Sequence, residues 1–147
     1  MPIPQFGTTG NLPEGIHLAT WQEVETTLAF NERRQELLAG MKRVCRNLKL
    51  CGCRKIYIGG SFATDKEFPG DFDICWEDNE EFDFEYLEQL DPVLMDFDNK
   101  RAAQKAKYGG ETFPASFIAV GRSQKTFLDF FQEDRNGNRK GLVAVDL

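Results

Sequence analysis

The stretch 56–76, IYIGGSFATDKEFPGDFDICW, constrains the fold of this chain more than any other part of its sequence. Residues 55–59 have the composition of a β-strand, and residues 71–76 have the composition of a second one. Gly59-Gly60-Ser61 and Phe68-Pro69-Gly70, which lie between them, are typical of turns. The sequence therefore predicts two strands and a chain that bends sharply where the first strand ends.

Helices are predicted before this stretch. Thr20-Trp21-Gln22-Glu23 has the form of a capping box, which indicates a short helix. Asn31 is the expected cap of a longer helix with one apolar stripe, and Gly52 is its expected stop. Residues 1–19 contain six Pro and Gly residues, so we expect an extended arm lying on the domain.

The second half of the chain mixes both kinds of element. We expect a loop leading into a helix over 77–90, either a short strand or a helix end over 93–97, and a helix over 99–108. Residues 113–120 are expected to form a strand, which Pro114 places at a sheet edge. A helix over 126–133, a turn at 136–138 and a last strand over 141–147 complete the expected order. The mixture predicts a single α+β domain, residues 1–147, with a mixed β-sheet flanked by helices.

Composition narrows the class of protein. The hydrophobic content of 41% indicates a packed core, and the sequence has no apolar run long enough to cross a bilayer. The N-terminal residues lack the charged and apolar regions of a signal peptide, so we expect a cytoplasmic protein without membrane contact. The four cysteines do not follow the spacing of a zinc site and are expected to be buried thiols.

Charge is distributed unevenly. The net charge is −6, and residues 71–98 hold 12 Asp or Glu and no Lys or Arg. An acidic chain is poorly suited to general nucleic-acid binding, because phosphate contacts dominate that affinity. The basic clusters within 33–55 and 100–107 are interpreted either as solvated helix faces or as phosphate contacts.

The turn and the second strand carry the candidate chemistry. Gly60 lets a ligand approach the main chain, and a helical turn starting at Ser61 would offer a hydroxyl and free N–H groups to a phosphate. In a strand, Asp71 and Asp73 lie on one face with Cα atoms roughly 6.6 Å apart, a spacing at which two carboxylates can hold hard cations. Because the same spacing recurs at Asp96 and Asp98, the aspartate pair alone decides little.

An apolar strand ending in Gly-Ser, a short connection and a strand opening with Asp-x-Asp resemble the nucleotidyltransferase fold of the DNA polymerase beta superfamily. IYIGGS followed by DFDICW is similar to its hallmark, and the chain most resembles the minimal, stand-alone bacterial nucleotidyltransferases. The resemblance implies that Gly59, Gly60 and Ser61 hold the β- and γ-phosphates of a nucleoside triphosphate. It also implies that Asp71 and Asp73 coordinate two Mg²⁺ ions.

The family usually adds a third carboxylate on a later strand. Glu111, after Gly109-Gly110, is favoured for this role over Asp96, which also sits at a possible strand, and over Asp129, which is expected on a helix. Lys66 and Lys105 are candidates to offset the triphosphate charge, although each is more often a surface lysine. The candidates to stack on a base are Tyr57, Trp76 and Tyr108, but core packing is the default expectation for such aromatic residues.

Two functions follow from the resemblance. The first is a Mg²⁺-dependent nucleotidyltransferase that moves a nucleoside monophosphate to a hydroxyl of a protein, a small molecule or an RNA end. Minimal enzymes of this kind often belong to toxin–antitoxin or phage-defence pairs. The second is a module with a degenerate metal site that binds a nucleotide or a protein partner. An unrelated α+β protein with an ordinary turn at 59–73 is a third interpretation.

Overall fold

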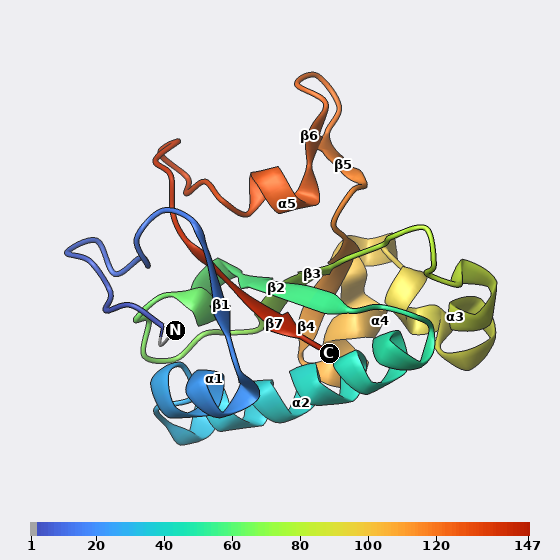
Figure 1. Ribbon diagram of the computed structural model, residues 1–147, viewed down its shortest axis with the longest axis horizontal. Helices are drawn as coiled ribbons and strands as arrows, with labels where there is room; N and C mark the ends of the chain where they lie inside the picture. The colour runs from blue at the N-terminus through green and yellow to red at the C-terminus, as the bar shows by residue number, and fades with distance from the viewer. Residues whose placement is uncertain (1–2) are drawn as a thin grey trace.

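A computed structural model describes residues 3–147 as one mixed five-stranded sheet with helices packed against it (Figure 1). The strands are β1 (Ile16–Ala19), β2 (Lys55–Gly59), β3 (Phe72–Trp76), β4 (Gly110–Pro114), β5 (Ile118–Val120), β6 (Lys125–Thr126) and β7 (Leu142–Asp146). The helices are α1 (Trp21–Thr27), α2 (Glu32–Leu50), α3 (Phe84–Leu90), α4 (Asp98–Tyr108) and α5 (Phe127–Phe130), with 3-10 turns η1 (Gly60–Ala63) and η2 (Pro92–Met95). The predicted α+β class and mixed sheet are confirmed.

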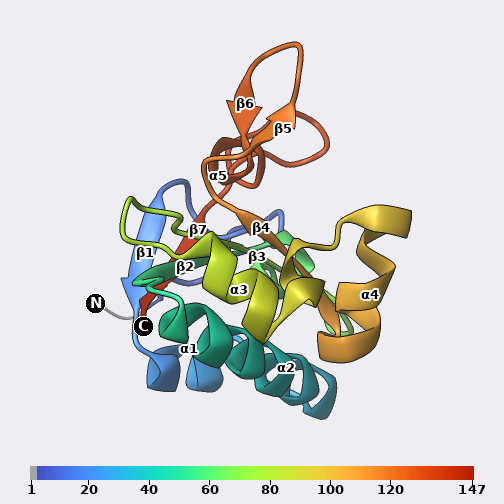
Figure 2. The same ribbon diagram turned by 90° about the vertical axis from the view of Figure 1, so that its right-hand side faces the viewer.

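The sheet has the strand order β1-β7-β2-β3-β4. Strand β2 is antiparallel to both of its neighbours, β3 and β7, whereas β1 is parallel to β7 and β4 is parallel to β3. Helices α1 and α2 lie under one face of the sheet in Figure 1, and the segment of β5, β6 and α5 rises from the other. Figure 2 shows α3 and α4 beside α2, near the β4 edge. The central strands are thereby covered, and their ends near η1 are left for the candidate site.

The predicted helix caps are confirmed. Thr20 Oγ1 accepts a hydrogen bond from Glu23 N at 3.1 Å, and Glu23 Oε1 accepts one from Thr20 N at 3.2 Å. Asn31 Oδ1 accepts a hydrogen bond from Arg34 N at 2.9 Å. These bonds satisfy backbone donors that a helix leaves free at its first turn. The apolar stripe of α2 is buried as predicted.

Three element predictions need correction. Residues 16–19, expected in the extended arm, form the edge strand β1. They pair with β7, which lies far away in the sequence, so no local pattern predicts this strand. Residues 1–2 of the expected arm lie outside the described part of the chain. The expected strand 113–120 is two strands: β4 ends at Pro114, at the sheet edge as its missing N–H requires, and β5 pairs with β6. For residues 93–97, where either a short strand or a helix end is expected, the structure shows the 3-10 turn η2 (Pro92–Met95).

The remaining expectations hold with shifted bounds. Helix α4 begins at Asp98 and is capped by Gly109 at φ +85°, but its first turn is left-handed, with φ between +53° and +61° at Asn99, Lys100 and Arg101. Helix α5 covers only four residues of the predicted 126–133. All four cysteines are buried and free. Within residues 3–147, no helix is long and apolar enough to span a membrane.

One buried cation ties helix α2 to the turn after β2. The Arg34 side chain is fully buried and donates hydrogen bonds to five main-chain carbonyl oxygens. Its acceptors are Leu28 at 2.9 Å, Phe62 at 2.8 Å, Ser61 at 3.2 Å, Lys66 at 2.7 and 3.0 Å, and Thr64. Burial lowers the pKa of Arg34 to about 10, which leaves it charged at neutral pH. Arg34, which belongs to the basic cluster 33–55, is therefore a structural residue. Neither a solvated helix face nor a phosphate contact, the two interpretations of this cluster, describes its role.

Replacing Arg34 with Lys should unfold the turn before it unfolds the domain. A lysine retains the charge but cannot present the planar set of donors that reaches these carbonyl groups, so buried acceptors lose their partners. We expect the free energy of unfolding to fall by about 3 kcal/mol, measured by urea denaturation. Hydrogen exchange should rise most at residues 61–66. Uniform exchange and unchanged stability would contradict this account; Arg46→Lys, on the exposed face of α2, is the control.

Candidate functional site

The site is built on a close approach between the η1 turn and β3. Gly60 has φ +61°, a left-handed conformation that favours glycine. A Cβ atom at this position would lie 2.1 Å from Asp73 Oδ2 and 2.8 Å from Asp73 Cγ. Only a residue without a side chain fits there. Glycine at position 60 is thus required for the main chain to reach the carboxyl group of Asp73, and Ser61 follows immediately.

Gly59 has a different setting. It ends β2, is buried and pairs in register with Asp73. A Cβ atom on it would lie 3.2 Å from both Phe131 Cβ and Leu142 Cδ2. Its lack of a side chain therefore lets residue 131 pack against the end of β2, and the residue does not line the cavity described below.

Asp73 and Glu111 are direct neighbours across parallel strands. They are in register in the β3–β4 pair, and their carboxyl groups share a hydrogen bond. Burial, the hydrogen bond with Glu111 and the negative charges of Asp71 and Glu111 together raise the pKa of Asp73 to about 8, although the charge of Lys140 acts in the opposite direction. At neutral pH Asp73 therefore keeps a proton, which it donates to Glu111.

Asp71, predicted to open the second strand, is a bend residue directly before β3; it and Asp73 are half-buried, while Phe72 and Ile74 are fully buried in the core. Burial and the charge of Glu111 raise the pKa of Asp71, whereas Lys105, Arg33 and Lys66 act in the opposite direction. The two aspartates and Glu111 thus influence one another electrostatically.

Glu111 is held by two cations from α4. Its Oε1 lies 2.8 Å from Arg101 Nη2 and 3.2 Å from Lys105 Nζ. Although burial opposes it, the hydrogen bonds from Asp73, Arg101 and Lys105 lower the pKa of Glu111, so this carboxylate is ionised. Asp96, the other candidate, follows η2 and accepts a hydrogen bond from Asp98 N at 3.1 Å. The strand register brings Glu111, and not Asp96, beside Asp73.

The three carboxylates do not close into one ligand set in this conformation. Within residues 3–147, no group of three or more His, Cys, Asp or Glu side chains is placed to hold a metal ion together. The donor chemistry nevertheless suits Mg²⁺, which takes one or two carboxylates, keeps several waters and binds substrate phosphates. The proton on Asp73 and the cations on Glu111 balance the negative charge that a metal ion would otherwise balance.

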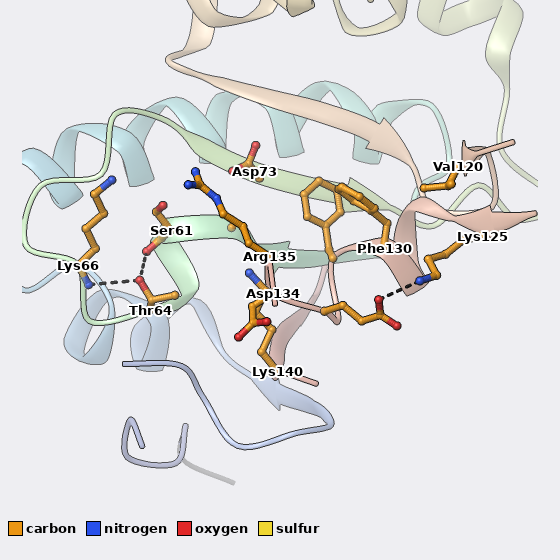
Figure 3. A pocket seen from close by; sticks show the side chains of 13 residues that line it. Ser61, Thr64, Lys66, Asp73, Val120, Lys125, Phe130, Asp134, Arg135 and Lys140 are labelled. Atoms are coloured by element: carbon orange, nitrogen blue, oxygen red, sulfur yellow. Dashed lines mark hydrogen bonds and ion pairs between the residues drawn. The ribbon is translucent and has the colours of Figure 1, made fainter. Parts of the chain in front are cut away.

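A cavity of about 830 Å³ opens next to the η1 turn and Asp73 (Figure 3). Four of the site residues predicted from the sequence line this cavity: Gly60, Ser61, Lys66 and Asp73. The predicted residues Gly59, Asp71, Lys105 and Glu111 are not among its lining residues. The rest of its wall comes from the C-terminal part of the chain, namely Val120, Lys125, Phe130, Phe131, Glu133, Asp134, Arg135 and Lys140, together with Thr64.

Sequence reasoning missed these C-terminal residues. Arg135 extends toward Ser61 and Asp73 in Figure 3. Burial lowers the pKa of Lys140, while the charges of Asp134 and Asp73 act in the opposite direction. Lys66, Arg135 and Lys140 form no ion pair with any carboxylate of residues 3–147. The only signal in the sequence was the basic flank of the predicted turn at 136–138, whose nearness to Ser61 depends on the tertiary fold.

The fold and this site define an α+β protein with a glycine turn, paired carboxylates and a cavity lined by basic and acidic side chains. The chain belongs to a family of unknown function, DUF6932, whose match covers residues 4–146. No curated protein and no solved structure is significantly similar to it.

The raised pKa of Asp73 predicts how stability depends on pH in the metal-free protein. Because the folded-state pKa exceeds that of the unfolded chain, the stabilisation is present at low pH and is lost as the pH rises toward about 8. Asp73→Asn mimics the protonated carboxyl group at every pH. With a chelator present, we expect the variant to gain at least about 1 kcal/mol over the wild type between pH 5 and 8, by urea denaturation.

Glu88→Gln, on the exposed part of α3, is the control for removing one negative charge. A difference between Asp73→Asn and the wild type that stays constant over this pH range would contradict the raised pKa.

Proposed function

We propose that this protein is a Mg²⁺-dependent nucleotidyltransferase that moves a nucleoside monophosphate from a nucleoside triphosphate to a hydroxyl group. The observation that carries the proposal is the cavity whose lining brings the Gly60-Ser61 turn and Asp73 together with Lys66, Arg135 and Lys140, three cations without an ion pair within residues 3–147. Unpaired cations around a cavity favour an anionic ligand, and the phosphate-binding turn lies beside oxygen ligands suited to Mg²⁺.

The nucleotidyltransferase-like fold is part of the proposal. Strand β2, the turn η1 and strand β3 follow the order of the family hallmark, and Glu111 lies on β4, the next strand of the sheet. The three strands are neighbours in the sheet, so their functional residues meet at one edge. A resemblance of this kind is evidence for a fold and supports a function only through the site that the fold carries.

Each residue has a role under this proposal. The main chain at Gly60 and the hydroxyl of Ser61 bind the β- and γ-phosphates, with Gly59 placing the turn. The cations Lys66, Arg135 and Lys140 offset the triphosphate charge, while Lys105 forms an ion pair with Glu111. Asp71, Asp73 and Glu111 hold Mg²⁺, which when bound polarises the α-phosphate and steadies the leaving pyrophosphate.

The reaction is a substitution at phosphorus. The acceptor oxygen forms a bond to the α-phosphorus, the bond from that phosphorus to the β-phosphate oxygen breaks, and pyrophosphate leaves. The hydroxyl proton passes to an ionised carboxylate of the site. Placement and charge compensation supply most of the rate in such a reaction, so rigid positioning of Ser61 and Asp73 is the main task of the protein.

The acceptor is proposed to be a protein side chain or a small molecule, with an RNA end as the further choice. The net charge of −6 disfavours long nucleic-acid contacts. A place in a toxin–antitoxin or phage-defence pair in the cytoplasm is proposed on the family resemblance alone.

One observation favours the second candidate function, a degenerate module that binds a nucleotide or a protein without catalysis. Arg101 and Lys105 form ion pairs with Glu111, and within residues 3–147 the carboxylates are not placed to bind one metal ion together. If these ion pairs persist with a nucleotide bound, the third ligand is missing and turnover fails. The two functions share a binding cavity and differ only in this step.

Label transfer separates the two functions. We expect the purified protein with Mg²⁺, α-phosphate-labelled nucleoside triphosphates and cell extract to transfer label to an acceptor. Asp71→Asn and Asp73→Asn should each reduce transfer at least about 100-fold, since each replaces a carboxyl group that would bind Mg²⁺ with an amide. Glu88→Gln on exposed α3 should keep wild-type transfer.

Nucleotide binding without any label transfer would support the non-catalytic module instead. Neither binding nor transfer with any of the four common triphosphates would contradict the nucleotidyltransferase and the nucleotide-binding form of the module, and would leave only its protein-binding form. Thermal unfolding with and without nucleotide measures binding independently, because a ligand at 100 times its Kd stabilises by about 2.7 kcal/mol.

A further inference from the structure

The cavity has two chemically different ends. Ser61, Thr64 and Lys66 lie at one side of the view in Figure 3, and Val120, Lys125 and Phe130 lie at the other. The first side belongs to the η1 turn and the residues that follow it, and it offers a hydroxyl and Lys66, which has no ion pair within residues 3–147. The second side belongs to the segment of β5, β6 and α5, which was not assigned any role from the sequence.

The charged side chains at the second end, Lys125 and Glu133, are paired with each other. Lys125 Nζ lies 2.8 Å from Glu133 Oε2, and this hydrogen bond and ion pair lower the pKa of Glu133, whose Oε1 also lies 3.8 Å from Arg139 Nη1. What remains for a ligand at this end is the apolar surface of Val120 and Phe130. An elongated ligand that fills the cavity therefore has an anionic end and a flat, uncharged end.

Phe130 is an exposed aromatic ring within this cavity. Its exposed fraction is 46%, which is large for a phenylalanine in a small domain. It packs edge-to-face on Phe131, with ring centroids 5.5 Å apart and planes at 77°. Part of its surface is thus free toward the cavity while its edge is supported from below.

The support of this ring is fixed to the sheet. Phe131 lies against Gly59 at the end of β2, where a Cβ atom would come within 3.2 Å of it. Phe127 stacks on Phe113 of β4 with centroids 4.1 Å apart. Lys125 precedes the short helix α5 and Glu133 follows it, so their ion pair links the two ends of the helix. A ring held in this way loses little conformational entropy on binding, which favours stacking with a planar ligand.

We propose that Phe130 is the stacking surface for the nucleobase of the bound nucleotide, with the phosphates directed toward Ser61, Lys66 and Lys140. This inference rests on the proposed function and extends it by assigning the base-binding end to residues 120–133. Stacking on an aromatic ring tolerates any base, because every base has a π face. The cavity volume of about 830 Å³ is within the range of pockets that enclose ligands of this size.

Calorimetry with two probes tests the assignment. The probes are the α,β-methylene analogue of adenosine triphosphate, which carries a base, and inorganic tripolyphosphate, which does not, both with Mg²⁺. We expect Phe130→Ala to weaken the analogue about 5- to 150-fold and to leave tripolyphosphate unchanged. Phe130→Trp should bind the analogue at least as tightly as the wild type.

Two controls accompany these variants. Phe68→Ala removes another exposed phenylalanine, outside the cavity lining, and should change neither affinity. Lys66→Ala should weaken both probes, because it acts on the phosphates. Thermal unfolding confirms that Phe130→Ala is folded, as expected for a half-exposed ring.

The possible failures are distinguishable. If the wild type binds the analogue and Phe130→Ala binds it equally well, the base-stacking assignment is overturned and the nucleotide-binding function stands. If Phe130→Ala weakens both probes alike, Phe130 shapes the cavity and does not stack on the base, which also overturns it. If the wild type binds neither probe, the proposed function and this inference fail together.

Discussion

The position of the candidate site depends on the buried guanidinium of Arg34. The turn between β2 and β3 has few backbone partners of its own, and its carbonyl groups at 61, 62, 64 and 66 point to one cation on helix α2. A charge-assisted donor shared by several carbonyls is stronger than separate neutral bonds. Helix α2 is in turn anchored by its buried apolar stripe. The packing of the core therefore fixes where Ser61 lies relative to Asp73.

Asp73 and Glu111 form a site at which electrostatic repulsion between two carboxyl groups is compensated by other groups. Two carboxyl groups adjacent on parallel strands repel each other unless a proton, a basic side chain or a metal ion intervenes. In this conformation a proton stays on Asp73, and Arg101 and Lys105 neutralise Glu111. Such an arrangement is costly to keep for structure alone, and perturbed carboxyl groups beside a cavity are typical of functional sites.

The sequence predicted the parts of the fold that depend on local chemistry. The caps at Thr20 and Asn31, the strands β2 and β3 and the glycine turn between them all follow from short-range preferences of the residues involved. Strand β1 was missed because its partner β7 is more than a hundred residues away. Arg34 was missed because no pattern distinguishes a buried arginine from its exposed neighbours on a helix.

The same division applies to the site. Gly60, Ser61, Asp71 and Asp73 could be proposed from one motif, and the strand register selects Glu111 beside them. The cations Arg135 and Lys140 and the ring of Phe130 lie more than 50 residues later in the chain, and only the packing of residues 127–131 on β2 and β4 brings them to the turn. The aromatic candidates Trp76 and Tyr108 are instead buried in the core.

The central claim is that Ser61 and Asp73 face one pocket for a divalent ion and a phosphate. The most direct test is a crystal structure with Mn²⁺ and a non-hydrolysable nucleoside triphosphate, in which anomalous scattering locates the ion. The account predicts Mn²⁺ at about 2.1 Å from a carboxylate oxygen of Asp73, with a phosphate against the Gly60-Ser61 turn. An ion or triphosphate bound elsewhere, with this pocket holding only water, would contradict it.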